Sequence, residues 1–249
     1  MVSFAFIPAW FNGYSFVIFE FISMLVLFSI AFYSYRLYKF CKNKSYKDLA
    51  IAFSLIGIAF IAKLSTNIIV YYKILETQDF GLFTLTFQTM QASTIFYIIG
   101  FFFYRFLMLL GFYMFYLVIT KSEENTLFTI FFIVVTSLFS TNSYTIFYIT
   151  TLIFTATIAR FYMKNYKEKK VQNTKFLAIS FGLIAFSQVL FAISEYTEYL
   201  YIGGELLQLA GYLVLLRMFM RLIKSGGSKN KKCQKSEQGL KSLTTSLML

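Results

Sequence analysis

Apolar stretches of about twenty residues recur along nearly the whole chain, with short polar segments between them. A helix of about 20 residues crosses the roughly 30 Å hydrocarbon core of a bilayer. Hydrophobic residues make up 58% of the 249 positions, including 33 Phe and 19 Tyr, which is more than a soluble domain of this length carries. The sequence therefore predicts an all-α, multi-pass integral protein of the cell membrane.

The apolar pattern predicts seven membrane-spanning helices in one domain, residues 1–224. Their ranges are about 13–35, 48–67, 102–120, 127–140, 144–162, 176–194 and 202–222. Residues 225–249 are rich in Gly, Ser and Lys, which predicts a flexible basic tail. Dividing residues 81–120 into two spans would give eight helices, but it would also move a basic cluster at residues 160–175 to the outer side. We therefore favour seven.

Basic residues gather on one side of these seven helices. Twenty of the 23 Lys and Arg residues fall there, mainly in residues 36–47, 160–175 and 217–241. Because Lys and Arg accumulate in cytoplasmic loops, this asymmetry predicts an outside N-terminus and a cytoplasmic C-terminus. Both cysteines, Cys41 and Cys233, fall on the predicted cytoplasmic side, where we expect free thiols.

Two local matches indicate an internal repeat. Residues 47–56 match residues 175–184 at seven of ten positions, which relates the second helix to the sixth. Residues 109–112 resemble residues 209–212, which relates the third helix to the seventh. The predicted architecture is therefore a seven-helix bundle of three helices, a connecting helix and three more helices.

The first outer connection is longer than its counterpart in the second half. The extra piece lies at about residues 84–100, which contain Gln88, Gln91 and Thr94 among apolar residues. Two interpretations fit this composition: the piece extends the third helix outward, or it lies along the outer membrane surface. The sequence leaves both open.

Four charged residues, Glu20, Lys63, Arg105 and Glu205, lie inside predicted helices. Each is sixteen residues from a basic residue at the inner end of its helix, the four inner residues being Arg36, Lys47, Lys121 and Arg221. At about 1.5 Å per residue this is roughly 24 Å, so the four charges are predicted to form one layer in the outer third of the membrane. Gln188 and Gln208 are predicted nearby polar residues.

This layer has two interpretations. The four charges sum to zero, so they could form ion pairs such as Arg105 with Glu205 and line a site for a small ligand. Alternatively, each side chain could reach the outer interface by itself, since long charged side chains extend toward water.

The sequence also predicts the surroundings of the protein. A basic cluster in the tail, Lys229, Lys231, Lys232 and Lys235, predicts contact with anionic lipids of the inner leaflet. The expected partners are this bilayer, a cytoplasmic protein and a second copy of the chain; no nucleic acid is expected. With no His in the chain and no pairing of a nucleophile with a base, we expect no catalytic residues, no metal site and no cofactor.

The arrangement of three, one and three helices resembles the topology of opsins, receptor-type seven-helix proteins and small sugar transporters. An opsin is disfavoured because the seventh helix carries no lysine before Lys224, and a sugar transporter because Pro8 is the one proline. The segments at 36–38, 49–53 and 209–216 resemble uncharacterised archaeal and bacterial seven-helix proteins of sensor type. This resemblance implies a sensor-like or scaffolding protein that acts through a cytoplasmic partner. The alternative is a small-solute or ion transporter using the charged layer.

Overall fold

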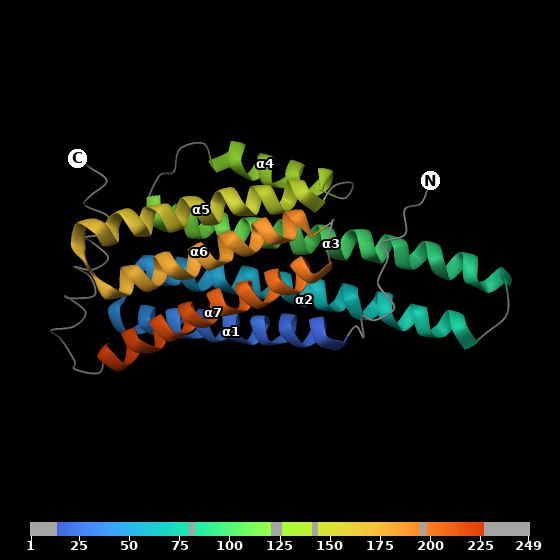
Figure 1. Cartoon of the computed structure of the whole chain (residues 1–249), viewed down its shortest axis with the longest axis horizontal. Helices are drawn as coiled ribbons and strands as arrows, with labels where there is room; N and C mark the ends of the chain where they lie inside the picture. The colour runs from blue at the N-terminus through green and yellow to red at the C-terminus, as the bar shows by residue number, and fades with distance from the viewer. Residues whose placement is uncertain (1–13, 80–82, 121–125, 141–143, 195–197, 227–249) are drawn as a thin grey trace.

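The computed structural model describes residues 14–79, 83–120, 126–140, 144–194 and 198–226, and every regular element in these ranges is an α-helix. The helices are α1 (Tyr14–Cys41), α2 (Lys44–Asp79), α3 (Phe83–Thr120), α4 (Thr126–Phe139), α5 (Tyr144–Lys169), α6 (Gln172–Ile193) and α7 (Glu198–Gly226). They run roughly along one common direction (Figure 1).

Six of the seven helices are long and apolar enough to cross a membrane, the shorter one being α4. With 14 residues, α4 is about 21 Å long, less than the roughly 30 Å of the hydrocarbon core. The outward surfaces of the helices are apolar as well: Phe32, Phe131 and Ile153 are each at least 60% exposed. Such a surface is stable against lipid and unfavourable in water, which indicates a multi-pass membrane protein.

The helices extend beyond the apolar stretches that predict them. For example, α1 runs on to Cys41 and α5 to Lys169, through basic sequence. Hydropathy marks the part of a helix that meets lipid, whereas the backbone hydrogen bonds continue into polar sequence. Residues 84–100 belong to α3, so this segment extends the third helix, which was one of its two interpretations. Together, α2 and α3 reach past the ends of the other helices (Figure 1).

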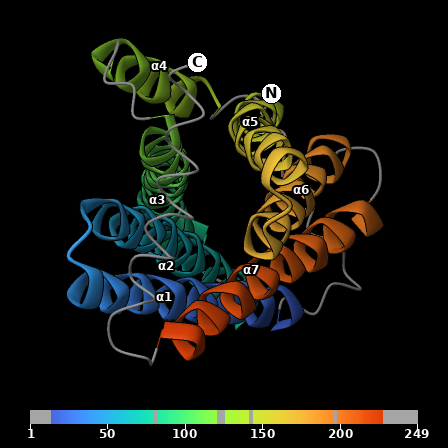
Figure 2. The same ribbon diagram turned by 90° about the vertical axis from the view of Figure 1, so that its left-hand side faces the viewer.

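The bundle consists of two units of three helices. In the first unit α2 packs between α1 and α3, and in the second unit α6 packs between α5 and α7. The units meet along two seams, α1 against α7 and α3 against α5, while α4 touches α3 and α5 from outside (Figure 2).

Aromatic contacts show that α3 and α5 run in the same direction. Tyr104 packs on Phe147 with 5.6 Å between ring centroids, and further along both helices Tyr113 packs on Phe154 at 6.4 Å. Because residue numbers increase together on both helices, the chain must return along the bundle between them. That return is the path of α4.

Four buried phenylalanines from both units form the centre of the bundle. Phe53 of α2 contacts Phe115 of α3 and Phe219 of α7, with centroid distances of 5.4 and 5.8 Å. Phe115 in turn contacts Phe181 of α6 at 4.7 Å. These tilted and edge-on arrangements are favourable for aromatic rings, so the units share a continuous apolar core.

A glycine brings two helices close together in each unit. A Cβ added to Gly111 of α3 would lie 2.5 Å from Cγ1 of Ile56 and 3.1 Å from the carbonyl oxygen of Ala52, both on α2. A Cβ added to Gly211 of α7 would lie 2.7 Å from Cγ1 of Ile184 and 3.0 Å from the carbonyl oxygen of Ser180, both on α6. Small residues at such contacts let membrane helices pack closely.

The expectation of a free thiol is wrong at Cys41, which is disulfide-bonded in the structure. That expectation relied on the reducing cytoplasm and on the loop positions predicted from charge, neither of which is a property of the cysteine itself. Cys233 lies outside the described residues.

Replacing Gly111 or Gly211 by Ala should destabilise the bundle, because each new methyl group overlaps the neighbouring helix. Overpacking of this kind costs about 1–3 kcal/mol. Gly182 is the matched control, since a Cβ there would have no neighbour within 4 Å. Gly182→Ala should be neutral or stabilising by up to about 1 kcal/mol, because Ala favours a helix. The free energy of unfolding in detergent micelles measures all three variants, and equal shifts would contradict the close contacts.

Candidate functional site

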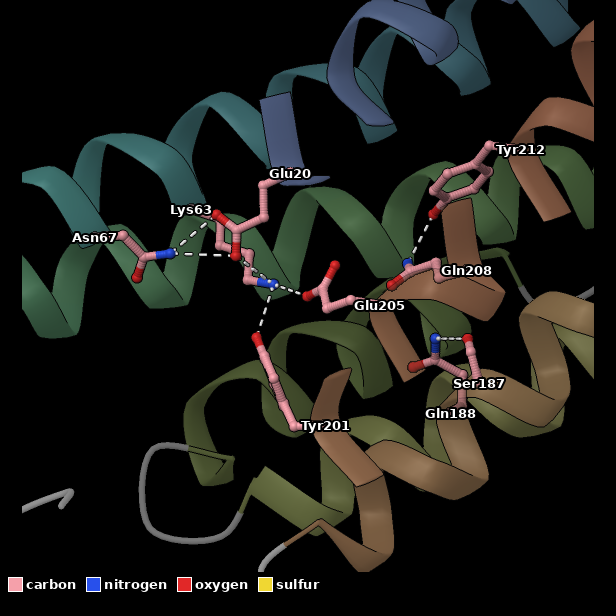
Figure 3. Close-up of polar contacts among 9 residues, drawn as sticks. All are labelled: Glu20, Lys63, Asn67, Ser187, Gln188, Tyr201, Glu205, Gln208 and Tyr212. Atoms are coloured by element: carbon pink, nitrogen blue, oxygen red, sulfur yellow. Dashed lines mark hydrogen bonds and ion pairs between the residues drawn. The ribbon is translucent and has the colours of Figure 1, made fainter. Parts of the chain in front are cut away.

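Lys63 of α2 is the centre of a buried cluster of charges. Its Nζ lies 2.8 Å from Oε1 of Glu20 on α1 and 2.9 Å from Oε1 of Glu205 on α7 (Figure 3). It also donates a hydrogen bond to the hydroxyl of Tyr201 at 3.2 Å. All three ammonium protons therefore have an acceptor. We call Glu20, Lys63 and Glu205 the ionic trio.

The ionic trio is enclosed by protein. Glu20 and Glu205 are each 1% exposed and Lys63 is 7% exposed. The rings of Phe60, Tyr104 and Tyr201 lie 6.0, 5.5 and 5.7 Å from Nζ of Lys63, within the range of cation–π attraction. The aromatic rings and the two carboxylates all favour the ammonium form of Lys63.

Helix geometry explains how the hydrogen-bonding neighbours join the site. Asn67 lies four residues after Lys63, and Tyr201 lies four residues before Glu205, so each shares a helix face with a member of the ionic trio. The amide nitrogen of Asn67 donates to Oε1 and Oε2 of Glu20 at 3.2 and 3.0 Å. The sequence did not single out Asn67, although its spacing of four residues from Lys63 was the signal that could have found it.

Arg105 of α3 lies outside the trio. Its neighbour Tyr104 faces Lys63, so Arg105 is at a similar height in the bundle, but its guanidinium is directed to α4 and α5. There Nη1 donates to the hydroxyl of Ser140 at 3.0 Å, and the guanidinium lies 4.7 Å from the ring centre of Tyr144. Arg105 is 2% exposed.

The structure thus brings together three of the four charged residues singled out in the sequence. The pair expected between Arg105 and Glu205 is not formed, because Lys63 holds Glu205 and the Arg105 side chain leaves α3 toward α4. Independent extension of each side chain to the interface is not observed either, since the trio members contact one another inside the bundle.

The other residues proposed from the sequence lie apart from the trio's hydrogen bonds. Gln208 donates to the hydroxyl of Tyr212 at 2.8 Å, one turn along α7, and Gln188 donates to the hydroxyl of Ser187 at 3.3 Å. Both glutamines are buried. The basic tail residues lie outside the described part of the chain: Lys229, Lys231, Lys232 and Lys235.

The ionic trio links helices at opposite ends of the sequence. The chain matches no known family model, no characterised protein and no solved structure. Its chemistry therefore has to be inferred from the contacts themselves. Two buried carboxylates that share one ammonium can bind or release a proton or another small cation, and their contacts with the ammonium can hold or free the helices that carry them.

Reversing the charges tests the observed pairing against the one expected from sequence. Lys63→Glu should destabilise the protein strongly, since breaking a buried pair costs about 3–5 kcal/mol. Adding Glu205→Lys to that variant restores two carboxylates and one ammonium and should recover part of the loss. Arg105→Glu should not be rescued by Glu205→Arg.

The yield of monodisperse protein and the free energy of unfolding in micelles measure these variants. Rescue of Arg105→Glu by Glu205→Arg, without rescue of Lys63→Glu by Glu205→Lys, would overturn the observed pairing.

Proposed function

We propose that the chain is a membrane carrier for a small solute or ion and that the ionic trio is part of its transport site. The observation that carries this proposal is the position of the trio across the boundary between the units. Glu20 and Lys63 belong to the first unit, and Glu205 belongs to the second. A change in the charge of the trio therefore changes the attraction between two bodies that could move against each other.

The arrangement of the units supports this proposal. The first helix of each unit packs on the third helix of the other, α1 on α7 and α5 on α3. Such an arrangement is expected of two repeats related by an axis along the membrane normal, as in some transporters, where substrate sites lie at the repeat interface. The contacts of Gly111 with Ala52 and of Gly211 with Ser180 recur at the positions that the sequence repeat relates. We therefore infer an internal repeat of three, one and three helices.

Seven crossings, with the N-terminus outside and the C-terminus in the cytoplasm, belong to the same proposal. The support for a crossing by α4 is that α3 and α5 run in the same direction, so the chain between them must return to the other side. The orientation relies on the twenty basic residues on one side, which also favour anionic inner-leaflet lipids as surroundings.

Energetics favour a role for the trio beyond stability. A buried ion pair is often no more stabilising than apolar residues of similar volume, because desolvating both charges offsets their attraction. A charged residue at the centre of a membrane helix costs about 2.5–3.5 kcal/mol on insertion scales. Three such residues in one cluster are therefore a feature of ion or substrate pathways more than of scaffolds.

A carrier must open the site to each side of the membrane in turn. Gln208, three residues after Glu205 on α7, is buried in the described structure. With Cys41 and Cys233 replaced by Ser, a Gln208→Cys variant in sealed vesicles should react with a membrane-impermeant thiol reagent added on either side. Mass spectrometry measures the labelled fraction.

Ile58→Cys is the matched control, because Ile58 is 44% exposed on the apolar outer surface of α2 and should react from neither side. Labelling of Gln208→Cys from one side only, or from neither, would contradict alternating access. Solute flux into reconstituted vesicles, measured for a panel of monovalent ions, sugars and amino acids, then identifies the substrate.

The second candidate is the sensor-like or scaffolding function to which the sequence resemblance points. The observation in its favour is the helical pair of α2 and α3, which projects past the rest of the bundle and could receive a signal (Figure 1). This function requires a cytoplasmic partner that co-purifies with the chain. Robust solute flux without such a partner would rule it out.

A further inference from the structure

The ionic trio has an unequal number of charges. Two carboxylates share one ammonium, and both ion pairs use the same Nζ of Lys63. Among the described residues, Lys63 is the one basic residue within 4.0 Å of either carboxylate. With both glutamates ionised, the cluster would keep one uncompensated negative charge in a buried place, which is strongly unfavourable.

The two carboxylates are not equivalent. Both oxygens of Glu20 accept hydrogen bonds from Asn67, and Oε1 also contacts Lys63. Among the described residues, Glu205 accepts one hydrogen bond, from Lys63 to Oε1, and its Oε2 points away from Lys63 (Figure 3). The two carboxylates therefore differ in the donors that face them.

We propose that the two carboxyl groups of the ionic trio, Glu20 and Glu205, form a proton-binding site that holds one proton between them while Lys63 keeps its contacts with both. The proton comes from water and returns to water, so no electron transfer or co-reactant is involved. With the proton bound, the remaining carboxylate balances the ammonium of Lys63 and the trio carries no net charge. This inference rests on the proposed carrier function and names its coupling ion.

Groups on the surrounding helices leave this assignment intact. Tyr104 on α3 and Tyr201 on α7 face Lys63 as neutral phenols near neutral pH. Behind Tyr201 the ring of Phe191 on α6 lies at 5.2 Å, and Tyr148 of α5 stacks on Phe191 at 5.3 Å. The charge of the trio is therefore set by its own three members.

Proton binding would also change how firmly the units are tied. Two ionised carboxylates attract the ammonium of Lys63 more strongly than a pair that holds one proton. Because the trio joins α1 and α2 of the first unit to α7 of the second, uptake of the proton weakens the tie between the units and its release strengthens the tie. This links the protonation state to the movement that a carrier needs.

Infrared spectroscopy of the full chain in lipid nanodiscs tests the proposal through the carbonyl stretch of a protonated carboxyl group. In the wild-type protein at neutral pH we expect one such group, shielded from bulk water. Glu205→Gln and Glu20→Gln should each remove it, because the one carboxyl group that is left then pairs with Lys63 and ionises. Lys63→Met should give about a twofold larger band, because neither carboxyl keeps a cation.

A wild-type spectrum without the band, or a band that persists in Glu205→Gln, overturns the proton site. The two glutamine variants keep this test decisive even where Lys63→Met fails to fold. The band is measured at equilibrium, so it is independent of transport. The expected band together with one-sided labelling of Gln208→Cys would leave the proton site standing and overturn the carrier. Labelling of Gln208→Cys from both sides without the band would leave the carrier standing and overturn the proton site.

Discussion

The attraction of one ammonium for two carboxylates fixes how the helices of this bundle are rotated and aligned. Lys63 meets Glu20 near the start of α1 and Glu205 in α7 with contacts of 2.8 and 2.9 Å. A shift of either helix by one turn, about 5.4 Å, would separate the charges. Apolar faces alone tolerate such shifts, because one leucine or phenylalanine can replace another. The cluster therefore specifies one register among several that the core would accept.

At the level of the ionic trio, the two units carry different side chains at related positions. Continuing the alignment of residues 47–56 with 175–184 sets Phe191 against Lys63, and the second offset sets Arg105 against Glu205. Phe191 packs on Tyr201 and Tyr148, whereas Arg105 is held by Ser140 and the ring of Tyr144. At these related positions the first unit thus carries two cationic side chains, Lys63 and Arg105, whereas the second carries an aromatic ring and a carboxylate.

Much of the helical layout could be predicted from the sequence, and the pairing of charges could not. Long apolar runs indicate membrane helices directly, because a helix that crosses the lipid needs a long run of apolar residues. Counting residues from Arg221 and Lys47 indicated a common height for Glu205 and Lys63, since a helix has a fixed rise. The partner of Arg105, however, depends on helix rotation and on where α4 lies. Neither quantity is encoded in hydropathy, and Ser140 carries no charge that would attract attention.

In the seven crossings proposed above, the path of α4 has a consequence for how the chain is inserted into a membrane. A unit of three helices begins on one side of the bilayer and ends on the other, so a second unit joined to it directly would enter upside down. Because α4 returns the chain before α5 begins, α3 and α5 run in the same direction. The basic residues after α1 and those at the end of α5 then emerge on one face. The short helix α4 therefore lets both basic segments lie on the same face of the bundle. If the two units were joined directly, these segments would lie on opposite faces.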